Sequence, residues 1–159
     1  MSRIGQGIQI SISWIPQKNG EYPSNAIFVD KDVFVARCKH GDEYIPGKLI
    51  PENKKCYCPY DGRELSFSKY EVLCDTSVDP YIKGYEWVKC TGDEYPADAI
   101  LAGVTKDGKS VFIARGIVQE DVCSGKAVEG HKCAYMSWGG TEYTVDEFEI
   151  LVWKLNGTK

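Results

Sequence analysis

The sequence predicts an all-β protein of two tandem homologous repeats, sandwich-like and related by a pseudo-twofold axis. Short β-branched or aromatic runs bounded by Gly, Asp and Pro predict strands at 33–35, 70–73, 111–113 and 148–151. No segment keeps an apolar period of 3.6 residues over the length of a helix. The stretch FVARCKHGDEYIPGK also returns as FIARGIVQEDVCSGK, with Phe, Ala, Arg and the final Gly-Lys kept.

The retained residues define the expected domain organisation. Trp, Tyr-Pro, Phe-x-Ala-Arg and Gly-Lys recur in the same order in both units. The second unit is longer just before its Phe-x-Ala-Arg motif, where Asp107-Gly108 predicts a hairpin, while Asp30-Lys31 marks a shorter turn in the first unit. We therefore expect an N-terminal strand at 1–13, a first repeat at 14–74, a linker at 75–86 and a second repeat at 87–155.

The N-terminal strand follows from apolar residues at every second position, namely Ile8, Ile10, Ile12 and Trp14. An apolar edge strand must pair either with its own chain or with a neighbouring molecule. The second possibility predicts a homodimer formed by exchange of this strand.

Charge and hydropathy exclude several classes of partner. The net charge of -4 and the pI near 5.2 provide no basic field for nucleic acid or anionic membranes. No apolar run approaches the length of a membrane span, and the alternating amino terminus does not resemble a signal peptide. We expect a cytoplasmic protein, with release that needs no signal peptide as the alternative.

The seven cysteines are predicted to be reduced, because an odd number cannot all pair and no export signal is present. None recurs at the equivalent position of the other repeat. Cys56 and Cys58 correspond to Ala134 and Met136 in the second repeat. The sequence offers no second closely spaced Cys/His pair that would complete a zinc site with them. We therefore expect small buried apolar side chains, no metal and no cofactor.

The ordered motifs resemble the DM-nine repeat. They comprise Trp, Tyr-Pro, an Asp/Gly turn, Phe-x-Ala-Arg, Gly-Lys, Tyr-x-x-Tyr/Trp-x-Gly-x-Glu and Tyr/Phe-Glu-x-Leu, and they cover residues 14 to about 155. The resemblance implies an all-β tandem-repeat protein, related to the amino-terminal part of natterin-like proteins. Several members are mannose-binding lectins of innate recognition, and others carry aerolysin-like pore-forming domains, for which we expect no room here.

The resemblance also implies site residues. In lectin-type members the sugar is held by the Lys of Gly-Lys and by an Asp from the turn before Phe-x-Ala-Arg. The lysines match Lys48 and Lys126, and Asp30 is the acidic candidate of the first site. In the second unit Thr105 takes the position of the Asp and Asp107 follows two residues later, which makes the second site the weaker expectation.

The residue chemistry fits a sugar independently. A hexose presents neighbouring hydroxyls that donate and accept, so a carboxylate beside an ammonium can fix two of them. The glycine before each lysine would let backbone and ligand approach closely. An acidic pair precedes each lysine, Asp42-Glu43 in the first repeat and Glu120-Asp121 in the second. Glu43 and Asp121 are therefore secondary candidates for the sugar site.

Other retained residues favour structural roles. Arg37 and Arg115 are predicted to form repeated ion pairs with acidic partners drawn from Glu64, Glu71, Glu142 and Glu149. Trp138, which faces Tyr60 across the repeat, is the aromatic expected at a sugar-binding rim. His40 and His131 are not equivalent, so a repeated general base is absent and we expect no enzyme.

Three classes of function follow. The first is a lectin for mannose-type glycans in innate immune or pathogen recognition. The alternative is a non-catalytic intracellular stress-response or interaction scaffold, which would need an apolar surface patch. A hydrolase is the third, and would need a cleft with a nucleophile and a base.

Overall fold

A computed structural model describes residues 12–77, 81 and 83–154 and confirms the all-β fold class. Apart from the 3₁₀ turn η1 (Pro51–Asn53), every named element is a strand. None of the described residues belongs to a helix of the length and apolarity that crossing a membrane requires. Ile8 and Ile10 of the expected N-terminal strand lie outside the described residues.

The strands fall into two equivalent halves. The first half contains β1 (Ile12–Lys18), β2 (Phe28–Asp30), β3 (Val33–His40), β4 (Glu43–Ile50), β5 (Lys55–Tyr60), β6 (Arg63–Phe67) and β7 (Lys69–Asp75). The second half contains β8 (Tyr85–Cys90), β9 (Leu101–Val104), β10 (Ser110–Val118), β11 (Asp121–Val128), β12 (Ala134–Trp138), β13 (Thr141–Val145) and β14 (Phe148–Trp153).

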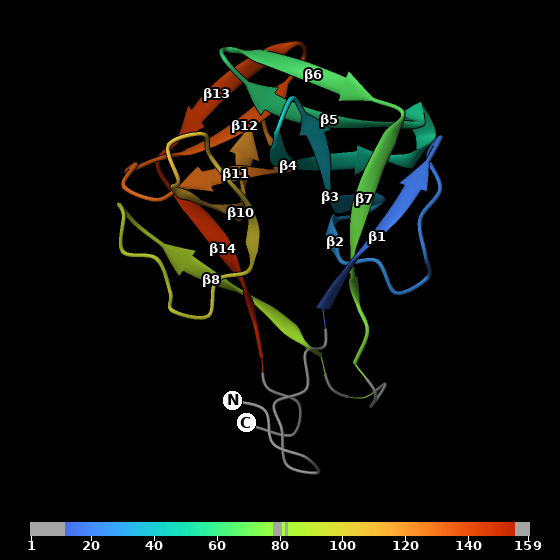
Figure 1. Ribbon diagram of the computed structural model, residues 1–159, viewed down its shortest axis with the longest axis horizontal. Helices are drawn as coiled ribbons and strands as arrows, with labels where there is room; N and C mark the ends of the chain where they lie inside the picture. Colours follow the sequence, from blue (N-terminus) through green and yellow to red (C-terminus); the bar gives the residue numbers. More distant parts are fainter. Residues whose placement is uncertain (1–11, 78–80, 82, 155–159) are drawn as a thin grey trace.

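All these strands belong to one curled sheet whose order is symmetric. The order is β1-β7-β3-β4-β5-β6-β13-β12-β11-β10-β14-β8, with β2 added to β3 and β9 added to β10. Reading inward from the two ends of the sheet gives matching strands. Strand β1 corresponds to β8, β7 to β14, β3 to β10, β4 to β11, β5 to β12 and β6 to β13. Figure 1 shows the halves on either side of the molecule, with β6 and β13 side by side at the top, where the two halves join.

The hairpins that begin each Phe-x-Ala-Arg strand differ in length, as the sequence predicts. In the second half Gly108 has φ of +85° and donates its N–H to the Thr105 carbonyl at 2.9 Å. In the first half β2 pairs with β3 across a short turn in which Asp32 has φ of 59°. Glycine and Asp are residues that tolerate such positive φ values.

Strand β1 pairs with its own chain. It runs antiparallel to β7, with Trp14 opposite Leu73, and it ends the described sheet on one side while β8 ends it on the other. The described part of the predicted N-terminal strand thus pairs within the chain.

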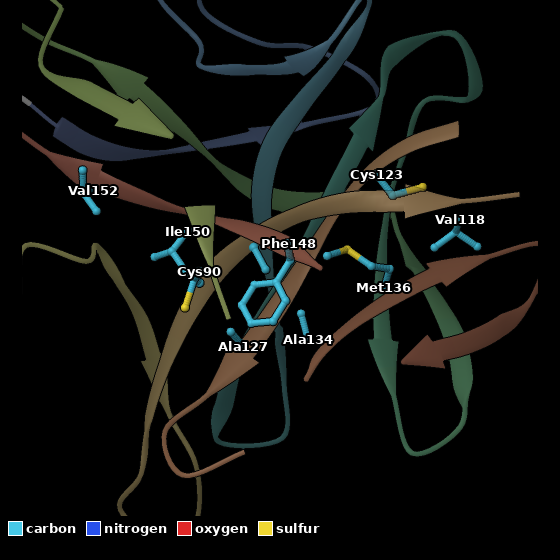
Figure 2. Close-up of a cluster of buried hydrophobic side chains, with 10 residues drawn as sticks. Cys90, Val118, Cys123, Ala127, Ala134, Met136, Phe148, Ile150 and Val152 are labelled. Atoms are coloured by element: carbon cyan, nitrogen blue, oxygen red, sulfur yellow. The ribbon is translucent and has the colours of Figure 1, made fainter. Parts of the chain in front are cut away.

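The buried side chains form three clusters. One belongs to each half, and the third combines residues of both halves, among them Ile27, Val35, Ile113 and Leu151. Figure 2 shows the cluster of the second half, in which the Phe148 ring lies amid small and branched side chains with Met136 beside it. The shared cluster holds the two halves together, because separating them would expose apolar side chains of both halves to water.

The repeated arginines Arg37 and Arg115 tie the halves together. The Arg37 Nε donates to Glu71 at 2.8 Å, its Nη1 donates to the Ala102 carbonyl of the other half at 2.7 Å, and its guanidinium lies over the Trp14 and Tyr44 rings. The expected structural ion pair is present.

Arg115 repeats this arrangement in the opposite direction. Its Nε donates to Glu149 at 2.7 Å, its Nη1 donates to the Val29 carbonyl of the first half at 3.1 Å, and its guanidinium lies over Trp87. Each arginine therefore joins an ion pair in its own half to a backbone carbonyl of the other.

The glycines of the repeated Gly-Lys pairs are required by backbone packing. A Cβ on Gly47 would stand 2.0 Å from the Tyr57 carbonyl oxygen, and one on Gly125 would stand 2.0 Å from that of Tyr135. The sequence suggested that these glycines let a ligand approach the backbone closely. In the structure the neighbouring strand makes that close approach. The following lysine is consequently held on a rigid, closely packed pair of strands.

We predict that Gly125→Ala destabilises the protein by about 3 kcal/mol, because the added methyl must displace the backbone of β12. Gly116→Ala on β10 is the matched control. Its Cβ would meet the Val145 Cγ1 at 3.0 Å and the Met136 Cε at 3.4 Å, so its closest contacts are side-chain atoms and are less severe than the 2.0 Å backbone contact at Gly125. Urea unfolding of both variants measures the effect, and equal losses of unfolding free energy would contradict the role of the β12 backbone.

Candidate functional site

The lysine of the second Gly-Lys pair lies in an open pocket. Lys126 is on β11, and its Nζ is 3.7 Å from the Glu142 Oε2 on β13. The same ammonium lies over the Tyr60 ring at 5.2 Å and the Tyr135 ring at 5.7 Å. An ion pair and two aromatic faces therefore meet at one point, and Tyr60 comes from the other half.

The pocket around Lys126 has a volume of about 300 Å³. Its lining residues are Asp61, Thr105, Asp107, Lys109, Lys126, Val128, His131, Tyr135 and Glu142. The expected residues Thr105, Asp107 and Lys126 are thus brought together. Asp61 joins them from the turn between β5 and β6 of the first half.

Local hydrogen bonds hold the lining in place. The Thr105 Oγ1 accepts the Lys109 N–H at 3.1 Å, which fixes the tip of the β9–β10 hairpin. The His131 Nδ1 and the Tyr135 hydroxyl are 2.8 Å apart. Burial raises the pKa of Tyr135 to about 12, and the Cys133 thiol and Glu142 carboxylate add to the rise. Tyr135 is therefore a neutral phenol at neutral pH.

Glu142 is fixed across the boundary between the halves. Its Oε1 accepts the Gly62 N–H at 2.9 Å, while its Oε2 faces Lys126. In the counterpart, the Glu64 Oε1 accepts the Gly140 N–H at 2.8 Å, and its Oε2 faces Lys48. Each glutamate thus connects a lysine of its own half to a turn of the other half.

The first lysine has the same framework but a different environment. Lys48 on β4 is 6% exposed, and its Nζ is 3.9 Å from the Glu64 Oε2. It donates to the Ser137 carbonyl at 2.7 Å and contacts the Cys123 Sγ at 3.5 Å, both in the second half. The first ammonium is therefore saturated by protein groups, whereas the second faces a pocket.

The remaining predicted site residues lie elsewhere. Asp30 ends β2 with an exposed side chain, and the described acidic partner of Lys48 is Glu64 instead. The Glu43 Oε2 accepts the Lys106 N–H at 2.9 Å, so Glu43 holds the β9–β10 hairpin. The Asp121 Oδ2 accepts the Trp138 Nε1–H at 2.8 Å.

The sequence left the acidic partners of the arginines open between two repeated pairs of glutamates. The structure pairs the arginines with Glu71 and Glu149, and it places Glu64 and Glu142 beside the lysines instead. The sequence did carry a signal, because both glutamates recur with the same spacing after the two lysines. The contribution of Tyr60 and Asp61 to the other half's pocket could not be seen, since it depends on how the halves pack.

A group of thiols is the possible metal-binding feature among the described residues. Cys38, Cys56 and Cys58 are buried, and their sulfur atoms all lie within 4.8 Å of one another. Burial opposes ionisation of Cys58, yet hydrogen bonds from the other two thiols and the nearby Lys126 charge lower its pKa to about 5. Burial raises the pKa of Cys56 well above its usual range.

Two other hollows accompany the structural arginines. One of about 460 Å³ is lined by Arg37 and Glu71, and one of about 400 Å³ is lined by Arg115 and Glu149. Both are larger than the Lys126 pocket. Volume alone therefore does not identify the site, and the Lys126 pocket is preferred because the predicted residues Thr105, Asp107 and Lys126 line it together.

Comparisons with known proteins agree with this architecture. The family model described as "DM9 repeat" matches residues 29–145. Natterin-4 of Thalassophryne nattereri is 27% identical over 148 residues, which cover 89% of this chain and 34% of that protein. The solved structure of the nematode sperm cell motility protein MFP2B superposes with a TM-score of 0.67 at 16% identity.

The superposition covers 95% of this chain and 46% of the MFP2B chain. At that identity the likeness establishes the fold alone. This chain spans about a third of natterin-4 and less than half of MFP2B.

The raised pKa of Tyr135 predicts a loss of stability at high pH. The unfolded phenol ionises near its ordinary pKa of about 10, whereas the folded phenol stays protonated until about pH 12. Between these values the unfolded state holds fewer protons, so stability falls as pH rises.

We therefore expect the parent to lose more unfolding free energy between about pH 9 and about pH 12 than Tyr135→Phe, which has no proton to release. Urea unfolding at several pH values measures the difference. Parallel stability curves for the two proteins would rule out a late-titrating Tyr135.

Proposed function

Because this chain belongs to the DM9 repeat family, we propose that it is a carbohydrate-binding protein whose principal site is the Lys126 pocket. The observation that carries the proposal is the meeting of the Lys126 ammonium, the Glu142 carboxylate and two tyrosine rings beside an open hollow. The counterpart lysine lacks this opening.

The pocket supplies the groups that a sugar requires. The Lys126 ammonium donates, and the carboxylates of Glu142, Asp107 and Asp61 accept, so neighbouring hydroxyls can be bound in both directions. The Tyr135 ring lines the pocket and offers an aromatic surface to the C–H groups of a pyranose. Glu142 needs little reordering, because its other oxygen is held by the Gly62 N–H.

Mannose-type glycans are the proposed ligands, and innate immune or pathogen recognition is the proposed role. Both rest on the resemblance of the Gly-Lys motif to lectin-type members of the family. A shallow polar site of this kind binds a monosaccharide weakly, near the millimolar range that corresponds to about 4 kcal/mol. Useful strength would come from several protein copies engaging one branched glycan.

We propose binding without catalysis. The His131–Tyr135 contact is the nearest approach to a base and nucleophile in the pocket lining that the structure describes. The raised pKa of Tyr135 makes its hydroxyl a poor nucleophile at neutral pH.

The alternative function, an interaction scaffold, has one observation in its favour. Phe28 on β2 is 54% exposed and Leu101 on β9 is 49% exposed. They begin equivalent strands, so each half presents an apolar side chain at a corresponding place. If the parent binds no glycan, these side chains become the first candidates for a protein contact.

We predict that Lys126→Ala weakens binding to immobilised mannan at least tenfold, the loss expected when a charged hydrogen bond worth about 1.5–3 kcal/mol is removed. Lys48→Met should bind like the parent, because Lys48 is saturated internally. Surface plasmon resonance of the parent and both variants measures the ratio.

Lys154→Ala is the control for charge, since it also removes one positive charge but from an exposed ion pair with Glu86. Each variant must be shown to be folded at the assay temperature before its binding is compared, because Lys48→Met leaves Glu64 without its ion-pair partner and should melt at a lower temperature. Undiminished binding by folded Lys126→Ala would assign the sugar to another site. Loss of binding in Lys48→Met alone would move the site to the first half.

A further inference from the structure

The thiol group of the first core is unusual in composition and place. Cys38 comes from β3, and Cys56 and Cys58 come from β5, the two strands that lie on either side of β4. All three are at most 1% exposed. The Cys56 and Cys58 sulfur atoms are 3.9 Å apart, and the three sulfur atoms lie within 4.8 Å of one another.

The second half shows that packing does not require three thiols here. The counterparts of Cys38, Cys56 and Cys58 are Gly116, Ala134 and Met136. The Met136 Cε lies 3.4 Å from the position of a Cβ on Gly116, so one long side chain fills the space above the glycine. Within the described chain the cluster is confined to the first half.

The spacing suits a metal ion. Three thiolates bound at about 2.3 Å around one ion stand about 4 Å from each other. The Cys56–Cys58 pair already has this separation, and Cys38 needs to move by less than about 1 Å. Soft thiolate ligands select Cu⁺ and Zn²⁺ over hard cations such as Mg²⁺ and Ca²⁺.

The surroundings of the cluster are apolar and exclude competing water, so the charge of a metal–thiolate group must be nearly balanced. Each thiol releases its proton when it binds the ion, and three thiolates around a divalent ion leave one net negative charge. The Cys58 thiol donates to the Ile45 carbonyl at 3.3 Å, and this contact is given up when the thiol ionises.

We propose that Cys38, Cys56 and Cys58 form a three-thiolate binding site for a thiophilic metal ion, either Zn²⁺ or Cu⁺. This departs from the sequence expectation of no metal, which rested on Cys56 and Cys58 finding no complementary pair. The third ligand lies far away in sequence and is brought in by strand β3. The ion is an addition to the fold, because the second half closes the equivalent space without thiols.

The test uses the full chain, unfolded in guanidinium with a reductant that does not bind metal and refolded without metal. Cd²⁺ is the probe, because its thiolate complexes give an ultraviolet charge-transfer band. Refolding with Cd²⁺ and adding it to folded protein are compared, since the thiols are buried. We expect one equivalent of Cd²⁺ to bind, and competition with Zn²⁺ or Cu⁺ then identifies the preferred ion.

The decisive variant transfers the residues of the second half, Cys38→Gly, Cys56→Ala and Cys58→Met. Its matched control removes three thiols elsewhere, Cys74→Val, Cys90→Ala and Cys133→Ser. The transferred variant should bind Cd²⁺ at least 100-fold more weakly, while the control should bind like the parent. Cys58→Ala alone gives the same comparison if the triple replacement does not fold.

Failure of the refolded parent to bind Cd²⁺ would overturn the proposal, and so would an equal loss in the control. Oxidation of the cluster to a disulfide under these reducing conditions would count against it as well. None of these readouts depends on glycan binding, so the result is independent of the proposed function.

Discussion

The reciprocal exchange of hydrogen bonds between the halves is the constraint on which the rest of the structure depends. Arg37 and Arg115 each reach a backbone carbonyl of the opposite half. Glu64 and Glu142 each accept an N–H from the opposite turn. Partly buried charged groups need partners to offset the loss of water, and here each half supplies some of the partners of the other.

This exchange explains why Gly-Lys is kept at the end of a motif whose middle varies. The glycine lets the next strand approach within contact of its Cα, and the lysine then faces a glutamate that the other half holds in place. The middle residues form the ends of these paired strands and the turns between them, and some of them make contacts that differ between the halves, such as that of Cys123 with Lys48. At the retained end of the motif, the glycine is therefore required for strand packing, and the lysine positions a positive charge beside a glutamate.

Much of the fold follows from the sequence, because its repeat supplies an internal comparison. The strand segments at 33–35, 70–73, 111–113 and 148–151, the two hairpins of different length and the presence of arginine ion pairs could be predicted. The composition of the sites could not, because Tyr60 and Asp61 reach the pocket of Lys126 from the other half. A repeat alignment compares residues at equivalent places, whereas a pocket between halves combines residues at different places.

The differences between the two lysines arise at these cross-half positions. Lys48 meets Cys123 and the Ser137 carbonyl, whereas the counterpart of Cys123 in the first half is Ile45, whose side chain has no hydrogen-bonding group. Lys126 consequently lacks this internal partner, and its side chain lines the pocket instead. The residues that the halves share therefore determine the scaffold, and the residues that they do not share determine which ammonium is available to a ligand.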